Sequence, residues 1–164
     1  MLRLRMVKQL PSHCGPACME MIGDYFGVKK SQKEWGKECG TTRKDGTSAK
    51  RMVAAAREAG FSAMVKDNAS FSDIQKWLRK KIPVIVDWFS VDEGHYSVAV
   101  KLDRKYIWLA DPETAKIRKM DRKIFFRVWF DFHGDALRTK DDVILRRIII
   151  ISKQESKHAT HPQR

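Results

Sequence analysis

The first chemically informative group in the chain is the thiol of Cys14. It stands in segment 9–18, directly ahead of residues with helical periodicity. A thiol at the start of a helix lies beside N–H groups that have no partner within the helix, at the positive end of the helix dipole. Both features favour the thiolate, which is the nucleophilic form of cysteine. Cys14 is therefore a candidate nucleophile.

Two residues in the second half of the chain could serve such a thiolate. His95 opens the strand-like run Tyr96–Leu102, and Asp111 closes the next run, Tyr106–Ala110. Strands joined by a short turn bring these two residues to the same end of a sheet, with neighbouring strands about 5 Å apart. We therefore expect an imidazole that exchanges protons with the thiol and a carboxylate that orients the imidazole.

The elements that must position these groups follow from hydrophobic periodicity and from capping residues. Helices dominate the first half of the chain, and short β-branched runs dominate the second half, which predicts an α+β fold with the helices on one side of an antiparallel sheet. The expected helices span 15–25, 31–39, 48–59, 70–80 (or from 72) and 123–130, and the expected strands span 61–65, 84–89, 96–102, 106–110, 116–120 and 143–151.

Length and composition indicate one globular domain. The chain has 164 residues, of which 43% are hydrophobic and 32% charged, enough for a core without disulfides or a metal. We place this domain at 1–152 and expect 153–164, which lacks apolar anchors, to be a disordered basic tail. We see no run near the roughly 18 apolar residues of a membrane span and no signal core, so we expect a cytoplasmic protein.

The net charge of +13 favours anionic partners. The charges are spread along the chain, so a solvated basic surface is the simpler interpretation and a nucleic-acid site is unlikely. Three cysteines form an odd set without secretory context, which favours free thiols. Cys14 and Cys18 lie about one helical turn apart, a weak zinc signal, and Cys18 fits the core better. We expect neither a metal nor a cofactor.

Four segments together resemble a known family. They are Gln9, Cys14-Gly15-Pro16-Ala17, His95-Tyr96 and Asp111-Pro112, in that order. The combination resembles the C39-like, bacteriocin-processing-type cysteine peptidases of the papain-like clan. The resemblance implies a papain-like fold, with the N-terminal helical half packed on a C-terminal antiparallel sheet. It also implies Cys14 as nucleophile, His95 as general acid/base and Asp111 as orienting group, with the Gln9 side chain and the Cys14 N–H as oxyanion donors.

The expected function is hydrolysis of a peptide bond through an acyl-enzyme on Cys14, with a peptide or protein as substrate. The charge of +13 favours an acidic substrate. Transfer of the acyl group to an amine would use the same residues. The alternative from another class is a non-catalytic binding module on the same fold that recognises an acidic peptide or another anionic partner. The sequence indicates no oligomeric state.

Overall fold

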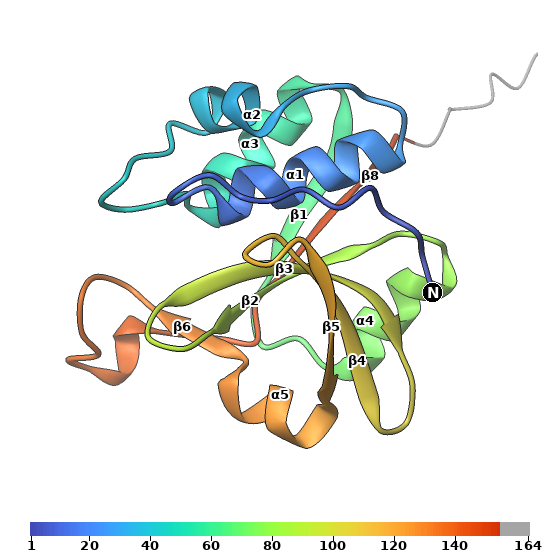
Figure 1. Cartoon of the computed structure of the whole chain (residues 1–164). Helices are drawn as coiled ribbons and strands as arrows, with labels where there is room; N and C mark the ends of the chain where they lie inside the picture. Colours follow the sequence, from blue (N-terminus) through green and yellow to red (C-terminus); the bar gives the residue numbers. More distant parts are fainter. Residues whose placement is uncertain (155–164) are drawn as a thin grey trace, which may run out of the picture.

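A computed structural model describes residues 1–154 and consists of a six-stranded sheet with helices against both of its faces (Figure 1). In chain order the elements are α1 (Cys14–Tyr25), α2 (Gln32–Glu38), α3 (Ala49–Glu58), β1 (Phe61–Lys66), α4 (Phe71–Arg79), β2 (Val84–Phe89), β3 (Gly94–Leu102), β4 (Tyr106–Asp111), β5 (Lys116–Asp121), α5 (Arg122–Val128), β6 (Phe130–Phe132), the 3₁₀ turn η1 (Lys140–Asp142), β7 (Val143–Leu145) and β8 (Ile148–Lys153).

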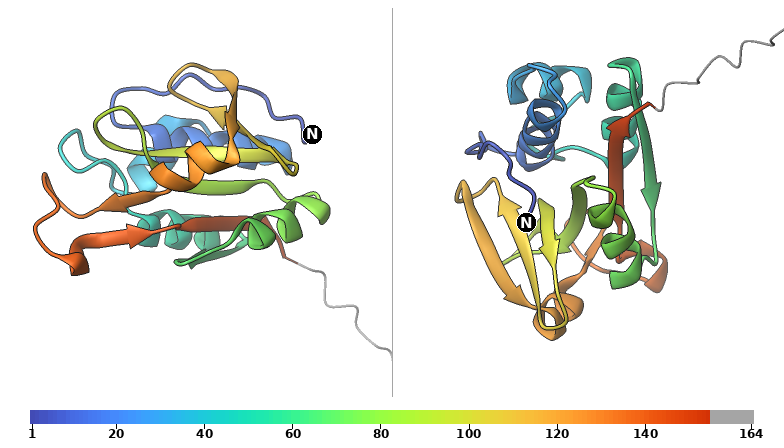
Figure 2. Two further views of the ribbon diagram at one scale, coloured as in Figure 1. Left: turned by 90° about the horizontal axis from the view of Figure 1, so that it is seen from below. Right: turned by 90° about the vertical axis from the view of Figure 1, so that its right-hand side faces the viewer.

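The main sheet has the strand order β1-β8-β2-β3-β4-β5, and every neighbouring pair is antiparallel. Strands β6 and β7 form a separate two-stranded sheet. The predicted α+β class with an antiparallel sheet is therefore confirmed. Figure 2 shows that the sheet is strongly curved, with β1 and β8 at one side and β4 and β5 at the other.

The expectation that all helices lie on one side of the sheet is wrong. Two cores sandwich the sheet: α1, α2 and α3 pack on one face, whereas α4 and α5 pack on the other (Figures 1 and 2). Strand β2 explains this arrangement. Val84 and Val86 belong to one core and Ile85 to the other. A strand that is apolar at consecutive positions needs cover on both faces.

The predicted strand 143–151 is also corrected. Arg146 adopts a left-handed conformation, with φ of +46°, and divides this segment into β7 and β8. Such a residue turns the chain out of an extended path. As a result β7 pairs with β6, whereas β8 enters the main sheet between β1 and β2. The short strand β6 was not predicted, because α5 ends at Val128, two residues before the expected end.

Serine side chains cap the starts of three helices. Ser31, Ser48 and Ser70 each accept a backbone N–H of the first turn of their helix. Ser31 and Ser70 complete capping boxes with Glu34 and Asp73, respectively. These contacts satisfy donors that the helices leave unpaired, so the helices begin where their sequences indicate.

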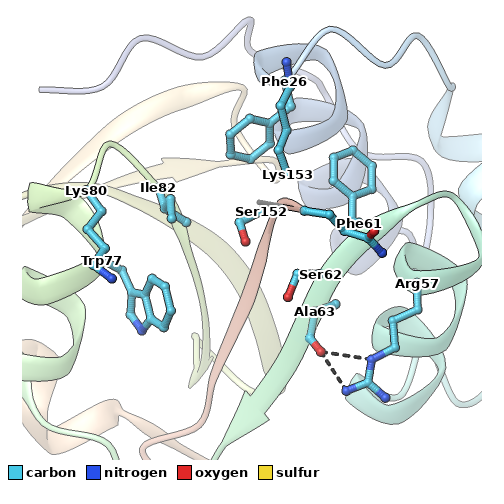
Figure 3. Close-up of a pocket in the computed structure, with 11 residues that line it drawn as sticks. Phe26, Arg57, Phe61, Ser62, Ala63, Trp77, Lys80, Ile82, Ser152 and Lys153 are labelled. Carbon is cyan, nitrogen blue, oxygen red and sulfur yellow. Dashed lines mark hydrogen bonds between the residues drawn. The ribbon is translucent and has the colours of Figure 1, made fainter. Parts of the chain in front are cut away.

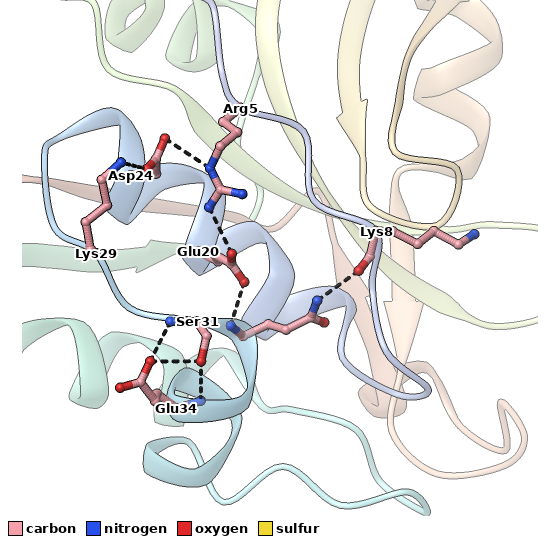
Figure 4. Close-up of polar contacts among 8 residues, drawn as sticks. Arg5, Lys8, Glu20, Asp24, Lys29, Ser31 and Glu34 are labelled. Carbon is pink, nitrogen blue, oxygen red and sulfur yellow. Dashed lines mark hydrogen bonds and ion pairs between the residues drawn. The ribbon is translucent and has the colours of Figure 1, made fainter.

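The N-terminal segment 1–13 runs between the two halves of the molecule without forming a helix or strand over most of its length. Its Arg5 guanidinium lies 2.9 Å from Glu20 and 3.4 Å from Asp24, both on α1 (Figure 4). At the opposite end of the chain, Lys153 still pairs with Phe61, one residue into the predicted tail. The rest of that tail, 155–164, lies outside the described residues.

Candidate active site

His95 and Asp111 form a buried pair at one end of the sheet. His95 is 5% exposed, Asp111 is fully buried, and Nε2 of His95 lies 2.7 Å from Oδ1 of Asp111. The β3–β4 hairpin produces this contact, because His95 lies near the start of β3 and Asp111 ends β4. The hydrogen bond expected from the sequence is therefore present.

The surroundings of His95 favour its protonated form. Burial alone would lower its pKa, but hydrogen bonds with Asp111 and with Cys14, together with the charges of these two groups, raise the pKa of His95 to about 9. Since Nε2 faces Asp111, the ring nitrogen left for the Cys14 thiol is Nδ1. The pKa of the ring thus responds to two groups, the Asp111 carboxylate and the Cys14 thiol.

Asp111 is held in its ionised form by three partners. Besides the His95 ring, the N–H of Glu113 donates to its Oδ1 at 3.0 Å, and Nη2 of Arg118 lies 2.9 Å from its Oδ2 in an ion pair off the hydrogen-bond direction. Burial opposes ionisation, but the hydrogen bond and charge of His95, with help from Glu113 N–H and Arg118, lower the pKa of Asp111 overall.

Arg118 was not predicted as part of the site. It lies on β5 and its guanidinium also faces the Trp88 ring at 5.5 Å. The register of the β4–β5 hairpin is the feature that could have identified Arg118. In this register Asp111 pairs with Lys116, which places Arg118 diagonally beside Asp111 on the same face. Among the several basic residues of β5, only the register distinguishes this one.

Cys14 is the first residue of α1, and the surrounding packing fixes its position. A Cβ at Gly15 would lie 3.0 Å from Sδ of Met52 and 3.3 Å from the Tyr96 ring, so the helix start is pressed against α3 and β3. The ring of His13 is used elsewhere: it bonds the Pro11 carbonyl at 2.8 Å. The first turn of α1 contains no acidic residue. The positive end of the helix dipole beside Cys14 is therefore not offset by a carboxylate of that turn.

The other two cysteines have different surroundings. Cys18 and Cys39 are fully buried, whereas Cys14 is partly exposed, and all three are free thiols. Burial raises the pKa of Cys18 well above its ordinary value and that of Cys39 to about 11. The placement of Cys18 in the core is confirmed, and Cys14 is the most accessible of the three thiols.

Gln9 lies beside the Asp111 end of the site. Its backbone N–H donates to the Pro112 carbonyl at 2.9 Å, and within residues 1–154 its buried Oε1 has no hydrogen-bond partner. The residues on either side of Gln9 are bonded to the side chain of Gln32, a residue that the sequence did not single out. The structure thus places Gln9 at the site, while its role as an oxyanion donor stays a prediction.

A tight turn joins Gln9 to Cys14. The N–H of His13 donates to the Leu10 carbonyl at 3.0 Å, with Pro11 and Ser12 as the central residues. Ser12 has φ of +60°, as the third position of a type II turn requires. Its hydroxyl donates to the Arg43 carbonyl at 3.0 Å, which holds a conformation that serine otherwise disfavours.

A second pair of carboxyl groups lies beside the start of β3. Asp87 on β2 is 2% exposed and pairs in register with Tyr96, and the carboxylate of Asp131 on β6 packs on Gly94, where a Cβ would come within 2.2 Å of Oδ2. Burial and the neighbouring Asp131 raise the pKa of Asp87 well above its ordinary value, and burial raises that of Asp131. The two carboxyl groups lie close enough to influence each other's pKa, and we assign a shared proton to Asp87, whose pKa is raised further.

The donor atoms of His95, Asp111 and Glu113 lie within 4.8 Å of one another, close enough to be considered for a cation. Arg118 already supplies positive charge there, 2.9 Å from Asp111 and 3.7 Å from Glu113. Arg118 thus supplies the positive charge that faces Asp111 and Glu113 in this cluster.

A pocket among the described residues lies away from the predicted catalytic residues. Its volume is about 880 Å³, and it opens near Phe26, at the C-terminal end of α1, whereas Cys14 lies at the N-terminal end (Figure 3). Aromatic, basic and hydroxyl side chains line it, including Phe61, Trp77, Arg57 and Ser62. None of the predicted catalytic residues lines this pocket.

No helix in residues 1–154 combines the length and apolar character of a membrane span.

The structure combines a cysteine at the start of the first helix with a buried histidine–aspartate pair at one end of an antiparallel sheet, an arrangement typical of the papain-like class. The chain belongs to the peptidase C39 family, because the sequence model of this family matches residues 5–133. It is 33% identical over 109 residues to the lactococcin-G-processing and transport ATP-binding protein LagD of Lactococcus lactis, a match that covers 65% of this chain and only 15% of LagD. It is 32% identical over 124 residues to an uncharacterized protein of Methanothermobacter marburgensis, covering 76% of this chain and 79% of that protein.

Solved structures show the same fold. The peptidase domain of Streptococcus ComA aligns with a TM-score of 0.72 and 22% identity, covering 94% of this chain and all of that domain. A double glycine motif protease from an AMS/PCAT transporter, solved with its leader peptide, aligns with a TM-score of 0.69 and 21% identity over 93% and 94% of the two chains. The predicted fold and family are thus confirmed, and the family supports a peptidase of the hydrolase class.

Proposed function

We propose that this chain is a cysteine peptidase that hydrolyses a peptide bond through an acyl-enzyme on Cys14. The observation that carries the proposal is the position of the His95 ring, which lies 2.7 Å from the buried Asp111 and is close enough to the Cys14 thiol for that thiol to raise its pKa. A buried imidazole with a pKa of about 9 is an imidazolium at neutral pH, and it therefore holds a proton to donate.

In the first half of the reaction the Cys14 thiolate attacks the carbonyl carbon of the peptide bond, and the electron pair of the C=O bond moves to oxygen. When the C–N bond breaks, His95 gives its proton to the departing amine, leaving an acyl thioester. Asp111 keeps the ring oriented and stabilises its charge throughout. In the second half, neutral His95 takes a proton from water as the oxygen of that water attacks the thioester. The intermediate then collapses to a carboxylic acid and the Cys14 thiolate, with the proton from water left on His95.

The oxyanion of each tetrahedral intermediate needs hydrogen-bond donors. We assign these to the backbone N–H of Cys14, at the start of α1, and to the side-chain amide of Gln9. Oε1 of Gln9 is buried and has no hydrogen-bond partner within the described residues. No hydrogen bond through this oxygen therefore fixes the orientation of the side-chain amide.

The proposed substrate is a peptide segment in extended form. A structurally similar protease binds a leader peptide, which supports a peptide ligand for this fold. The net charge of +13 favours acidic residues in that peptide through long-range attraction, an effect that added salt would screen.

Selective alkylation tests the assignment of the nucleophile. At neutral pH iodoacetamide should modify Cys14 at least ten times faster than Cys18 or Cys39, because both of these thiols are buried with raised pKa values. His95→Gln should slow the reaction at Cys14, whereas His133→Gln, at an exposed position, should not. Equal labelling of the three thiols would overturn the proposal and favour a binding module on the same fold.

Peptide cleavage tests the reaction itself. The purified chain is incubated with a peptide library, and Cys14→Ser serves as the inactive control. New peptide termini that depend on Cys14 and His95 would support hydrolysis. Tight peptide binding that persists in Cys14→Ser without any cleavage by the unchanged chain would instead support the binding module.

A further inference from the structure

Gln32 occupies an unusual position relative to the proposed oxyanion donor. It is the first residue of α2, and its side-chain amide reaches the N-terminal segment on both sides of Gln9. Its Oε1 accepts the N–H of Leu10 at 2.8 Å, and its Nε2 donates to the Lys8 carbonyl at 2.8 Å. One side chain therefore fixes both peptide groups that flank Gln9.

Gln32 is itself anchored to the helix that carries the nucleophile. Its backbone N–H donates to Oε2 of Glu20 on α1 at 2.6 Å, and the other oxygen of Glu20 accepts Arg5 at 2.9 Å (Figure 4). Because Cys14 is the first residue of α1, this chain of contacts sets the distance between the N-terminal segment and the nucleophile.

Gln9 is also tied to the other half of the site. Its own N–H donates to the Pro112 carbonyl at 2.9 Å, and Pro112 follows Asp111 directly. The Gln9 backbone is thus held from the helical half through Gln32 and from the sheet half through Pro112. Segment 1–13 forms no helix or strand before α1 within the described chain. These three hydrogen bonds are therefore the contacts that hold the two peptide groups of Gln9 directly.

We propose that Gln32 is a positioning residue for the oxyanion site, holding Gln9 at the distance from Cys14 that the tetrahedral intermediate requires. This inference rests on the proposed function and adds to it a residue that does not touch the substrate. Preorganised donors lose most of their effect when displaced by about 1 Å, because the developing charge lies at one point. A side chain that fixes both neighbours of a donor residue prevents such a displacement.

The chemistry of the contact explains why an amide is needed here. The side chain must accept from one peptide group and donate to the next, and among side chains of this length only glutamine does both. Gln32→Glu keeps the shape and the bond from Leu10 N–H, but it places a carboxylate oxygen against the Lys8 carbonyl, where two acceptors face each other. Gln32→Ala removes both bonds.

Two reagents separate positioning of the oxyanion donor from activation of the thiol. Acylation by p-nitrophenyl acetate joins the acetyl group to Cys14 and releases p-nitrophenolate through a tetrahedral oxyanion. Alkylation by iodoacetamide displaces iodide from carbon and forms no oxyanion. Each rate is measured after subtraction of the Cys14→Ala background, which removes the reaction of lysines.

We expect Gln32→Ala and Gln32→Glu to slow acylation about tenfold or more while leaving alkylation unchanged, since removal of one oxyanion donor costs roughly 10²-fold. The unfolding midpoint in urea should change little, and the Leu10 amide should exchange its hydrogen faster in Gln32→Ala, which confirms that the contact is lost. Lys33→Ala, an exposed neighbour on α2, is the matched control and should alter neither rate.

A double-mutant cycle with Gln9→Ala decides the mechanism. If Gln32 acts through Gln9, then Gln32→Ala has no further effect on acylation once Gln9 is alanine. Additive effects of the two substitutions, or equal slowing of acylation and alkylation, would overturn the inference and leave Gln32 with a structural role only. An unchanged acylation rate in Gln9→Ala would also overturn the inference about Gln32. The assignments of Cys14 and His95 would not be affected, because the alkylation experiment tests them independently.

Discussion

Asp111 and Asp87 are equally buried aspartates on the same sheet with opposite protonation. Asp111 meets the His95 ring, the Glu113 N–H and the Arg118 guanidinium, and its pKa is lowered. Asp87 meets a second carboxyl group, that of Asp131, and its pKa is raised. Burial acts against the charge at both positions, so the sign of each shift depends on the partners.

The positive charge near Asp87 is already engaged. Arg147 approaches this region, but its Nε and Nη2 donate to the carboxylate of Asp67 at 2.7 Å and 2.9 Å. Without a dedicated cation, the pair formed by Asp87 and Asp131 keeps a proton instead. Asp111, whose pKa is lowered, thus lies beside the proposed catalytic histidine. Asp87, whose pKa is raised, lies on β2 and pairs with Tyr96 of β3, the strand that carries this histidine.

The largest effect is expected from Asp111→Ala. Loss of this carboxylate leaves a buried imidazole and a guanidinium without their partner, which should lower the free energy of unfolding by about 3–5 kcal/mol. The pKa of His95 should fall from about 9 because the main contact that raises it is lost. Alkylation of Cys14 at neutral pH should slow at least tenfold, measured with iodoacetamide.

Asp103→Ala is the control for that experiment. Asp103 also accepts two backbone N–H groups, from Lys105 and Tyr106, but it is exposed and lies in the turn at the far end of the hairpin. This substitution should leave the alkylation rate unchanged. If the two variants react alike, the carboxylate at Asp111 is not what sets the state of the His95 ring.

A smaller effect is expected from Gly94→Ala, which tests the contact between β6 and β3. The new Cβ would lie 2.2 Å from Oδ2 of Asp131, so the Asp131 side chain, or the strand that carries it, must shift, at a cost of about 1–3 kcal/mol in unfolding free energy. Asp131→Ala in the same chain should recover part of this loss, because it removes the clashing carboxylate. Equal losses with and without Asp131→Ala, measured by urea unfolding, would show that the strain arises elsewhere.

The smallest effect at neutral pH is expected from Asp87→Asn, which keeps a hydrogen-bond donor toward Asp131 and removes the titration. A raised carboxyl pKa stabilises the fold at low pH, and this contribution is lost as pH rises from the ordinary carboxyl range through the folded value. The variant should therefore lose less stability than the unchanged chain as pH rises. Urea unfolding at several pH values measures the difference, and parallel curves would contradict a shared proton.

His95 adds a second pH-dependent contribution to the stability of both the unchanged chain and Asp87→Asn. Its pKa is raised from 6.5 to about 9, so its contribution to stability is complete below pH 6.5 and declines as pH rises through about 9. This decline should remain in Asp87→Asn. Only the component from Asp87 should disappear, which is why the comparison uses the difference between the two curves.

Local chemistry made much of the site predictable. The residues flanking the β3–β4 turn specified a hairpin, and a hairpin places a residue before its first strand close to one that ends its second, which is how His95 and Asp111 meet. The capping serines marked the helix starts with similar reliability. In each case the signal and its partner lie within a few residues or one hairpin of each other.

The parts that were missed depend on contacts between distant segments. Nothing near Gln32 indicates that its amide reaches Lys8 and Leu10, and nothing near Asp131 indicates a carboxyl partner on β2. The division at Arg146 also has no local signal, because arginine rarely adopts positive φ. The two competing pairings of the segment around it, with β6 and with β1 and β2, are tertiary properties.

The place of β8 in the sheet has a consequence for how the chain folds. This strand lies between β1 and β2, and Phe61 pairs with Lys153, which a ribosome adds long after it has made the first four helices. Until β8 emerges, the edges of β1 and β2 that it will join stay open, and the apolar faces beside them lack their neighbour. Assembly of the sheet is therefore expected to be slow and late, because it waits for β8, the last strand of the described residues, and does not proceed from the first residues onward.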